Sequence, residues 1–418
     1  MLPEELSNGI CSLNPEEDRL TMTVFAEFSR QGKILRHDFF ETAIRSSARL
    51  TYGQVASALE ENSADNLPGI FGLLPALGLM RELARKIQAV RQKRGSIDFD
   101  LPEAEILLDL RGNIKEICRA ERNVAHRIIE EFMIAANETV AAYFHWLKVP
   151  GLYRVHEKPA EDTLASFSEF ASGFGHRFPA AHSIQPKMLS DYLASLQGLP
   201  EERVLNQVLL RSMKQARYGM ENIGHFGLAS PTYTHFTSPI RRYPDLVVHR
   251  LLRELLRRGR FSPEREEELI QTLPEIASHS SEREKVATDA EREVVNLKKV
   301  EFMMDKTGEA FDGFITGMAP FGFFVELKDF LIDGLVHVST LGDDYYSYSE
   351  ETQSIVGEHT KKIFRLGDPV RVRLEEVNRE RRQINFVLAR EETRKKRPTP
   401  KAGKKRVRRG KSGAEGGT

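Results

Sequence analysis

Apolar and polar residues alternate near the amino terminus of the chain. The apolar residues that fall on one face are Leu20, Met22, Val24, Ala26 and Phe28. This period of two, followed by a turn at 29–32 and a second alternating run at 33–43, predicts a β-hairpin. An isolated hairpin is only marginally stable, so we expect further strands or a covering helix. No residue before Met1 supplies them, and the sheet is therefore expected to be incomplete.

Helical spacing of apolar residues dominates the following part of the chain, up to about residue 305. The predicted helices are 51–60, 74–94, 117–147, 186–196, 201–218, 246–258 and 262–305. We expect the last one to break near Pro274, because proline lacks the amide hydrogen that a helix interior needs. Short strands are expected at 96–100 and 105–110. Residues 1–305 are therefore predicted to form one α+β unit.

The pattern changes after Gly308 to short strands that are separated by turns. The predicted strands are 309–317, 321–327, 333–338, 368–377 and 382–388. Five short strands in about 80 residues favour a small all-β barrel of the OB type over 306–390. Residues 391–418 are rich in Lys, Arg, Gly and Pro, cannot bury a core, and are predicted to be a disordered basic tail.

Composition narrows the class of protein. Of the 418 residues, 40% are hydrophobic and 29% are charged, as in ordinary globular proteins. No apolar run approaches the roughly 18 residues of a membrane span, and the amino terminus does not resemble a signal peptide, so we expect a cytoplasmic protein. Cys11 and Cys118 stand apart from any Cys/His cluster, which argues against a disulfide framework or a zinc site.

The net charge of zero hides an uneven distribution. Residues 391–418 hold 11 Lys or Arg against three Glu, a net charge of +8, so residues 1–390 carry −8. A strongly basic tail indicates a polyanionic partner, which it would bind through salt-sensitive contacts with phosphates. The alternative is a solvated extension that only aids solubility.

The segment from Thr234 to Asp245 has the sequence THFTSPIRRYPD. Ser238 followed by proline predicts a helix start, because the hydroxyl can cap the helix and proline suits its first turn. Cations are unfavourable at that end of a helix unless an anion is bound, so Arg241 and Arg242 there indicate a phosphate site. Ser238, Arg241 and Arg242 are its candidate residues. The alternative is that both arginines pair with acidic neighbours such as Asp245.

The predicted helix at 117–147 carries a polar stripe beside an apolar face. The stripe consists of Asn123, either His126 or Arg127, Glu130 and Asn137. Most such stripes face solvent, and the alternative is a stripe that lines an internal channel. Tyr52 and Phe99, which shares one side of a predicted strand with Ile97, are aromatic candidates for ligand contact, although either could belong to the core.

Aromatic and basic residues are also interleaved in the predicted barrel. Phe321 and Phe324 flank Gly322, and a bulge at this glycine could bring both rings to one face. Exposed aromatics beside cations are how OB barrels hold single strands, at roughly 1–3 kcal/mol per stacked base. Phe323 and Phe314 are expected to fill the barrel core instead.

Taken together, these motifs resemble a known family. His225–Ala229 (HFGLA) with Thr237–Asp245 resembles a signature of the RNB catalytic domain of the ribonuclease II and ribonuclease R family. Further similar segments are Met1–Pro15, Ala48–Val55, Ala125–Asn137 and Leu210–Tyr218. Residues 308–390 resemble an S1-type RNA-binding OB domain. The Lys-rich tail is more similar to that of ribonuclease R than to ribonuclease II.

The resemblance implies a processive, magnesium-dependent hydrolase that degrades RNA from its 3′ end to nucleoside 5′-monophosphates. By position, Arg241 matches the family's phosphate-contacting arginine, and Tyr52 and Glu130 match residues that help to recognise the ribose. These three are the catalytic candidates. The candidates for contacts with bases and RNA are Phe99, Phe321, Phe324, His337 and Arg382. The partner implied is single-stranded RNA, bound by a monomer.

One part of the family pattern is not found. Two-metal hydrolysis needs several converging carboxylates, which the family supplies from an aspartate-rich segment upstream of the part that matches Met1. We therefore expect no magnesium ligands in this chain, a catalytic domain that is truncated at its amino terminus, and no activity of the chain alone. The alternatives are a noncatalytic RNA-binding adaptor and, more remotely, a different phosphohydrolase with Glu130, Glu131 and His126 as metal ligands.

Overall fold

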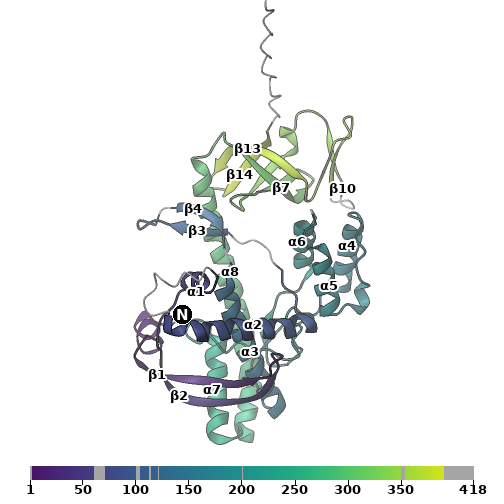
Figure 1. The fold of residues 1–418 in the computed structure, drawn as a ribbon. Coiled ribbons are helices and arrows are strands. Elements are labelled where there is room, and N and C mark those ends of the chain that lie inside the picture. The colour runs from purple at the N-terminus through teal and green to yellow at the C-terminus, as the bar shows by residue number, and fades with distance from the viewer. Residues whose placement is uncertain are drawn as a thin grey trace, which may run out of the picture.

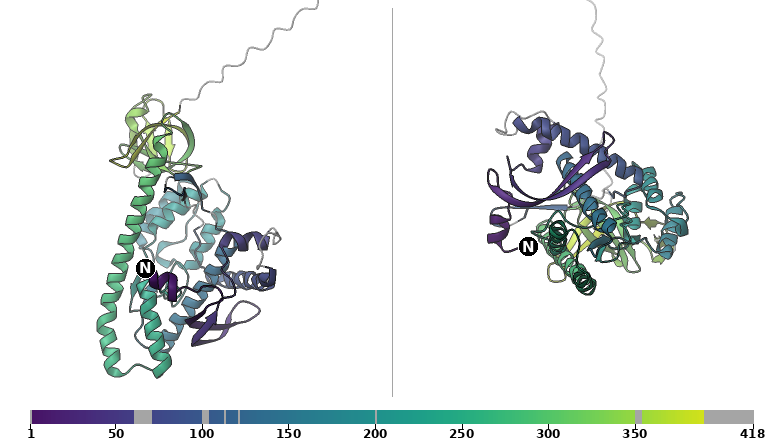
Figure 2. Two further views of the ribbon diagram at one scale, coloured as in Figure 1. Left: turned by 90° about the vertical axis from the view of Figure 1, so that its left-hand side faces the viewer. Right: turned by 90° about the horizontal axis from the view of Figure 1, so that it is seen from below.

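The computed structural model has a body of helices and hairpins and a closed barrel, which are joined by one long helix (Figure 1). It describes residues 2–60, 71–99, 104–112, 114–120, 122–199, 201–349 and 354–389. The long helix, α8 (Pro263–Met304), runs along one side of the body and ends at the barrel (Figure 2). The predicted tail at 391–418 lies outside the described residues. No helix in the described ranges is long and apolar enough to cross a membrane.

The predicted amino-terminal hairpin is confirmed. β1 (Asp18–Phe28) pairs antiparallel with β2 (Ile34–Arg45), and within the described part of the chain the two strands pair only with each other. Met22, Val24 and Phe39 on one face pack into a core that includes residues of α3 and α7. This packing gives the hairpin the covering helices that an isolated pair of strands requires.

Three helices form the centre of the body. They are α1 (Tyr52–Glu60), α2 (Leu74–Arg94) and α3 (Val124–Leu147), and an apolar cluster joins them. α2 ends as predicted, at Gly95 with a left-handed φ of 100°. α3 begins after Asn123, whose side chain accepts hydrogen bonds from the N–H groups of Ala125 and His126. The predicted helix start at residue 117 was therefore wrong.

The residues before Asn123 form a strand instead. β3 (Ala104–Leu108) pairs antiparallel with β4 (Ile114–Arg119), and Ile117 is buried in the largest core cluster. The predicted strand at 96–100 is also not observed over the described residues 96–99. There Ile97 is buried and donates its N–H to the carbonyl of Gly227.

A helical bundle leads from the body towards the barrel. It consists of α4 (Glu161–Ser172), which was not predicted, α5 (Pro186–Leu196) and α6 (Glu202–Ser212). The predicted helix at 201–218 ends at Ser212, because the chain then enters β6 (Arg217–Gly219), which pairs with β5 (Tyr153–Val155). Short helical turns are η1 (Glu5–Ile10), η3 (Phe71–Leu73), η4 (Ala181–Ser183) and η5 (Val338–Thr340).

Two further predictions about helices are corrected. α7 (Tyr243–Arg258) begins with Pro244 in its first turn, so the helix starts five residues after Ser238, whose own segment is a turn. α8 is one helix of 42 residues with Pro274 inside it, without the predicted break. Leu273 and Ala277 are buried on either side of the proline, and their packing holds the helix together there.

The barrel is closed and has five strands, as predicted. β7 (Ala310–Ala319), β8 (Gly322–Leu327), β9 (Asp333–His337), β13 (Pro369–Asn378) and β14 (Gln383–Leu388) form the order β13-β14-β9-β8-β7. A three-stranded sheet of β10 (Tyr346–Ser349), β11 (Ser354–Gly357) and β12 (Ile363–Arg365), which was not predicted, is inserted before β13. Phe323 fills the core as predicted, whereas Phe314 is half-buried with the Arg203 guanidinium 5.8 Å from its ring centre.

Candidate functional site

The turn that precedes α7 contains both candidate arginines, and its hydrogen bonds give the two side chains different roles. The carbonyl of Ser238 accepts hydrogen bonds from the N–H groups of Arg241 (3.3 Å) and Arg242 (3.0 Å). The fully buried carboxylate of Asp245 accepts from the N–H of Ser238 and from the guanidinium of Arg242, both at 2.7 Å. The alternative that we considered from sequence is therefore correct for Arg242, which stabilises the turn together with Asp245.

Arg241 is placed differently. Its side chain is exposed and, among the described residues, has no hydrogen bond or ion pair. It lines a cavity of about 940 Å³ between the start of α7 and the middle of α8. The polar and aromatic residues around this cavity include Tyr218, Arg242, Tyr243, His279, Arg283 and Glu284. Arg241 is thus a cation at the edge of a large open cavity, with no partner in the described structure, and an anionic ligand would complete this arrangement.

Buried polar contacts hold this turn from behind. Asn137 of α3 donates to the hydroxyl of Tyr233 and accepts from the N–H of Phe236, both at 3.0 Å. Asn137 is 2% exposed, so this member of the predicted polar stripe neither faces solvent nor lines a channel. It fixes the segment that leads to Arg241, a role that helical spacing alone does not indicate.

A layer of neutral histidines lies beneath the same turn. Nδ1 of His235 lies 2.8 Å from the Tyr218 hydroxyl, and Nδ1 of His225 accepts the N–H of Leu228. Burial lowers the pKa of His235 to about 2 and that of His225 to about 3, so both side chains are uncharged at neutral pH. The positive charge near the Arg241 turn therefore comes from its arginines and not from these two histidines.

Tyr52 and Glu130 lie where α1 meets α3. The Tyr52 ring is 47% exposed and stacks on His126 with 3.9 Å between ring centres. Glu130 pairs with Arg122, which also binds Asp98 at 3.0 Å. No hydrogen bond or ion pair in the described structure connects these side chains to the Arg241 turn. Phe99 is half-buried against the largest core cluster.

The barrel presents an aromatic face. Phe321 and Phe324 are 48% and 37% exposed, and their ring centres are 6.4 Å apart in an edge-to-face arrangement. His337 stacks parallel to Phe321 at the same distance. The two phenylalanines share a face as expected, but the bulge lies in β7 near Gly317, opposite Phe324, and Phe321 is in the preceding turn. Arg382 points to α8 instead, where it pairs with Glu293 at 3.1 Å.

The carboxylates of the described residues do not fit a magnesium site. No group of three or more His, Cys, Asp or Glu in these ranges could hold a metal ion. Glu131 is buried in a two-hydrogen-bond pair with Arg91, and His126 stacks on Tyr52. The remote hypothesis that Glu130, Glu131 and His126 form a metal site is therefore wrong.

Comparisons with known proteins match both parts of the chain. Residues 1–258 match the model of the RNB domain, and residues 304–388 match that of the S1 RNA binding domain. Ribonuclease R of Aquifex aeolicus is 44% identical over 390 residues, which cover 93% of this chain and 54% of the relative. Ribonuclease R of Escherichia coli is 39% identical over 423 residues, which cover 100% of this chain and 52% of the relative.

A solved structure is similar as well. Mycoplasma genitalium RNase R in complex with ribose methylated single-stranded RNA superposes with a TM-score of 0.87 at 31% identity. The match covers 93% of this chain and 60% of that one. The chain spans about half the length of the curated relatives it matches.

Proposed function

The chain belongs to the ribonuclease R and ribonuclease II family, whose members share the RNB domain, and we propose that it forms the RNA-holding part of a 3′-to-5′ exoribonuclease. The substrate is single-stranded RNA, and the product of the complete enzyme is nucleoside 5′-monophosphate. Arg241 contacts a backbone phosphate, Tyr52 and Glu130 contact ribose, and the barrel stacks bases further along the strand.

The observation that carries this proposal is the position of Arg241. It is the member of the arginine pair that no carboxylate of the described structure neutralises, and it borders a cavity on α8, the helix that ends at the barrel. Because a guanidinium binds phosphate through parallel hydrogen bonds, such a residue suits an RNA backbone. In the barrel that follows α8, the exposed rings of Phe321 and Phe324 can stack on bases.

Magnesium-dependent hydrolysis needs carboxylates beyond those that the described residues bring together. We therefore propose that this chain alone binds RNA without releasing nucleotides. In the complete enzyme the metal ions would polarise the phosphate and activate water. The residues of this chain hold the phosphate, ribose and bases in position for that chemistry.

Binding of a fluorescent single-stranded RNA to the purified chain tests the proposal. We expect Arg241→Gln to weaken binding by about tenfold, because charge-assisted hydrogen bonds contribute about 1.5–3 kcal/mol. The matched control is Arg250→Gln, which removes an exposed arginine of α7 that has no ion pair within the described ranges. Equal effects of the two substitutions would contradict the role of Arg241, and release of nucleotides by the chain in magnesium would contradict its proposed inactivity.

A second candidate function is that of a noncatalytic RNA-binding adaptor. It is favoured by the combination of an exposed aromatic face with carboxylates that, over the described ranges, do not assemble a metal site. The genomic sequence before the Met1 codon separates the two candidates. A coding segment rich in aspartate supports the nuclease, whereas unrelated sequence supports the adaptor.

A further inference from the structure

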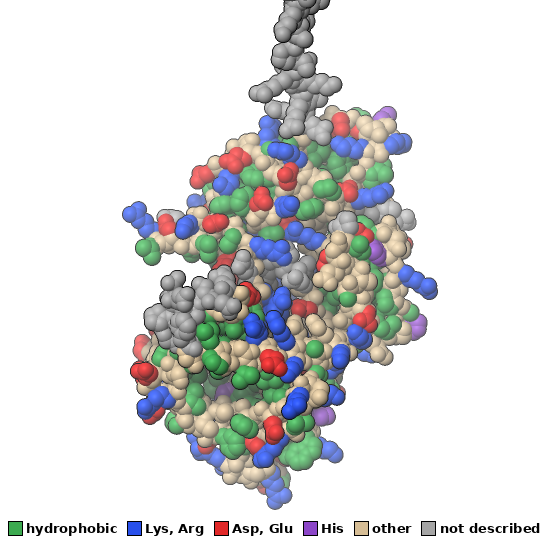
Figure 3. All heavy atoms as spheres, in the orientation of Figure 1, with side chains coloured by type: hydrophobic (Ala, Val, Ile, Leu, Met, Phe, Trp, Pro, Cys, Tyr) green, Lys and Arg blue, Asp and Glu red, His purple; other side chains and the backbone are tan. Residues whose placement is uncertain are grey.

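A second cavity, of about 300 Å³, lies between the end of α1, the middle of α2 and the start of α3. Its charged lining residues are Arg81, Arg85, Arg122, Arg127, Glu60 and Glu131. It shares no lining residue with the cavity beside Arg241. In Figure 3, Lys and Arg side chains gather in the hollowed middle of the visible face, above α2.

The charges of this cavity are not balanced. Four arginines against two glutamates leave a formal charge of +2 (4 − 2) among the lining residues. Glu131 is neutralised from behind by Arg91, which does not line the cavity, and so contributes little negative charge inside it. Of the four arginines, Arg122 is the one that has carboxylate partners within the described residues, namely Asp98 and Glu130.

The other three arginines are available to a ligand. Arg81 donates a hydrogen bond to the carbonyl of Leu59 at 2.8 Å, and no carboxylate in the described part of the chain pairs with it. The side chains of Arg85 and Arg127 have no hydrogen bond or ion pair with any described residue, and both are exposed. The start of α3 adds little, because Asn123 already caps the N–H groups of Ala125 and His126. Recognition here therefore depends on guanidinium groups.

We infer that this cavity binds the phosphate of a nucleotide, either within an RNA strand or as a free nucleoside 5′-monophosphate. Guanidinium groups from two helices can surround one phosphate with parallel hydrogen bonds. The volume lies at the lower end of the range for small-ligand sites. The choice of a nucleotide over other phosphates rests on the proposed function, in which the ligand of the chain is RNA.

The first arm of the test uses single-stranded RNA and the full chain. We expect Arg85→Gln with Arg127→Gln to weaken binding at least tenfold in about 0.1 M salt. If both arginines contact phosphates, the slope of log affinity against log salt should fall by about 0.7 for each lost contact. The control combines Lys93→Gln, on the same helix as Arg85, with Arg250→Gln, because neither residue lines this cavity.

The second arm uses uridine 5′-monophosphate, with uridine as the probe that lacks the phosphate, in equilibrium dialysis. We expect the monophosphate alone to bind, and its binding to be lost in the Arg85/Arg127 variant but kept in Arg241→Gln. If the Arg85/Arg127 variant changes the binding of RNA alone, the ligand is a backbone phosphate. If it changes the binding of the monophosphate, the ligand is a free nucleotide. The inference is overturned if the Arg85/Arg127 variant matches its control in both arms.

These outcomes remain distinct from those that test the proposed function. If Arg241→Gln weakens RNA binding and the Arg85/Arg127 variant has no effect in either arm, the cavity inference fails and the proposed function stands. If the chain does not bind RNA at all, the proposed function fails, and the monophosphate arm still decides whether the cavity binds phosphate.

Discussion

Buried histidines beneath the Arg241 turn couple its stability to pH. Burial lowers the pKa of His225 to about 3 and of His235 to about 2, whereas an unfolded histidine titrates near 6.5. Between these values the unfolded chain binds more protons than the folded one, so the free energy of unfolding falls as the pH falls below about 6.5. Each histidine contributes a slope of about 1.4 kcal/mol per pH unit in that window.

Urea denaturation at a series of pH values between 7 and 5 measures this slope. We expect His235→Gln to lower stability at pH 7 but to reduce the loss on acidification by about one histidine's share. His182→Gln is a suitable control, since that residue lies in the short turn η4 and is not buried. If His235→Gln and the wild type lose stability in parallel, His235 does not carry the effect.

Single residues also show what the sequence could not decide. Adjacent arginines at 241 and 242 are equivalent as a pattern. Both line the cavity, and only the turn around Asp245 places Arg242 in an ion pair and leaves Arg241 without one among the described residues. In the same way, Asn137 shares helical spacing with Glu130, yet it is buried because Tyr233 and Phe236 come from a loop about 100 residues away. Such long-range contacts have no local signal.

At the scale of elements, α8 contains one position, Pro274, at which a substitution should stabilise the helix. Pro274 lies inside the helix and is exposed, so it cannot donate a backbone hydrogen bond there and buries little surface. Pro274→Ala should raise the free energy of unfolding by about 1–3 kcal/mol, as measured by urea denaturation. The proposed control is Ile270→Ala, an exposed position one turn earlier, where we expect little change. A loss of stability in Pro274→Ala would show that the proline serves a required bend.

Strong periodicity decided which elements were predicted correctly. The five barrel strands have alternating residues and turns between them, and their predicted ranges closely match the observed ones. The last residues of β4 were assigned to α3 because Ile117, Val124 and Ile128 have a spacing that also fits one face of a helix. The start of α7 was misplaced because Ser238-Pro239 and Tyr243-Pro244 both resemble helix starts, and only Asp245, bonded back to the N–H of Ser238, turns the first into a loop.

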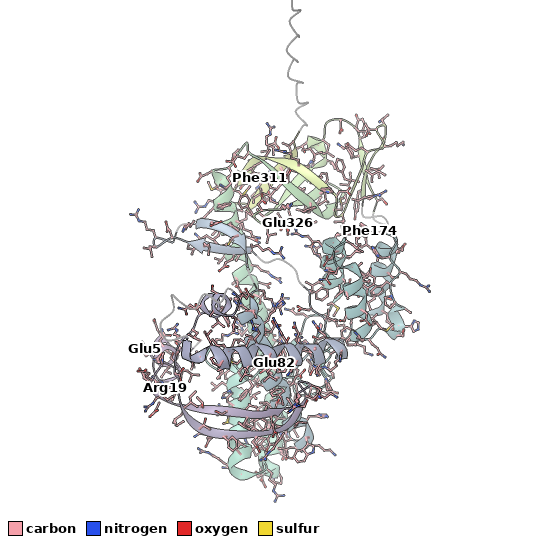
Figure 4. The ribbon with its side chains drawn as sticks, viewed as in Figure 1. Glu5, Arg19, Glu82, Phe174, Phe311 and Glu326 are labelled. Carbon is pink, nitrogen blue, oxygen red and sulfur yellow. The ribbon has the colours of Figure 1, made fainter. Side chains whose placement is uncertain are left out.

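At the scale of the molecule, the barrel and the body share one apolar core. The cluster that contains Phe323 and Phe386 of the barrel also contains Leu205 and Leu209 of α6. At the edge of this contact, Arg203 of α6 pairs with Glu326 of β8, which lies on the side of the barrel near α6 (Figure 4). We therefore expect barrel and body to unfold together, as a single transition in calorimetry.

Removing the Arg203 side chain should separate the unfolding of the barrel from that of the body. Arg203→Ala leaves the Glu326 side chain, which is 14% exposed, without its partner, and an unpaired buried charge is strongly unfavourable. We expect the barrel to unfold at a lower temperature than the body, in a separate transition. Because Arg203 is itself partly exposed, the loss should be about 2 kcal/mol, less than for a fully buried pair.

The double variant Arg203→Ala, Glu326→Ala makes the cause of that separation testable. Since it removes both charges, it should recover a large part of the stability that the single variant loses. Arg379→Ala provides the exposed comparison, because its pair with Glu301 at 3.0 Å leaves Arg379 62% exposed and should contribute at most about 1 kcal/mol. If the double variant is no more stable than Arg203→Ala, the loss in the single variant does not come from an unpaired Glu326 carboxylate.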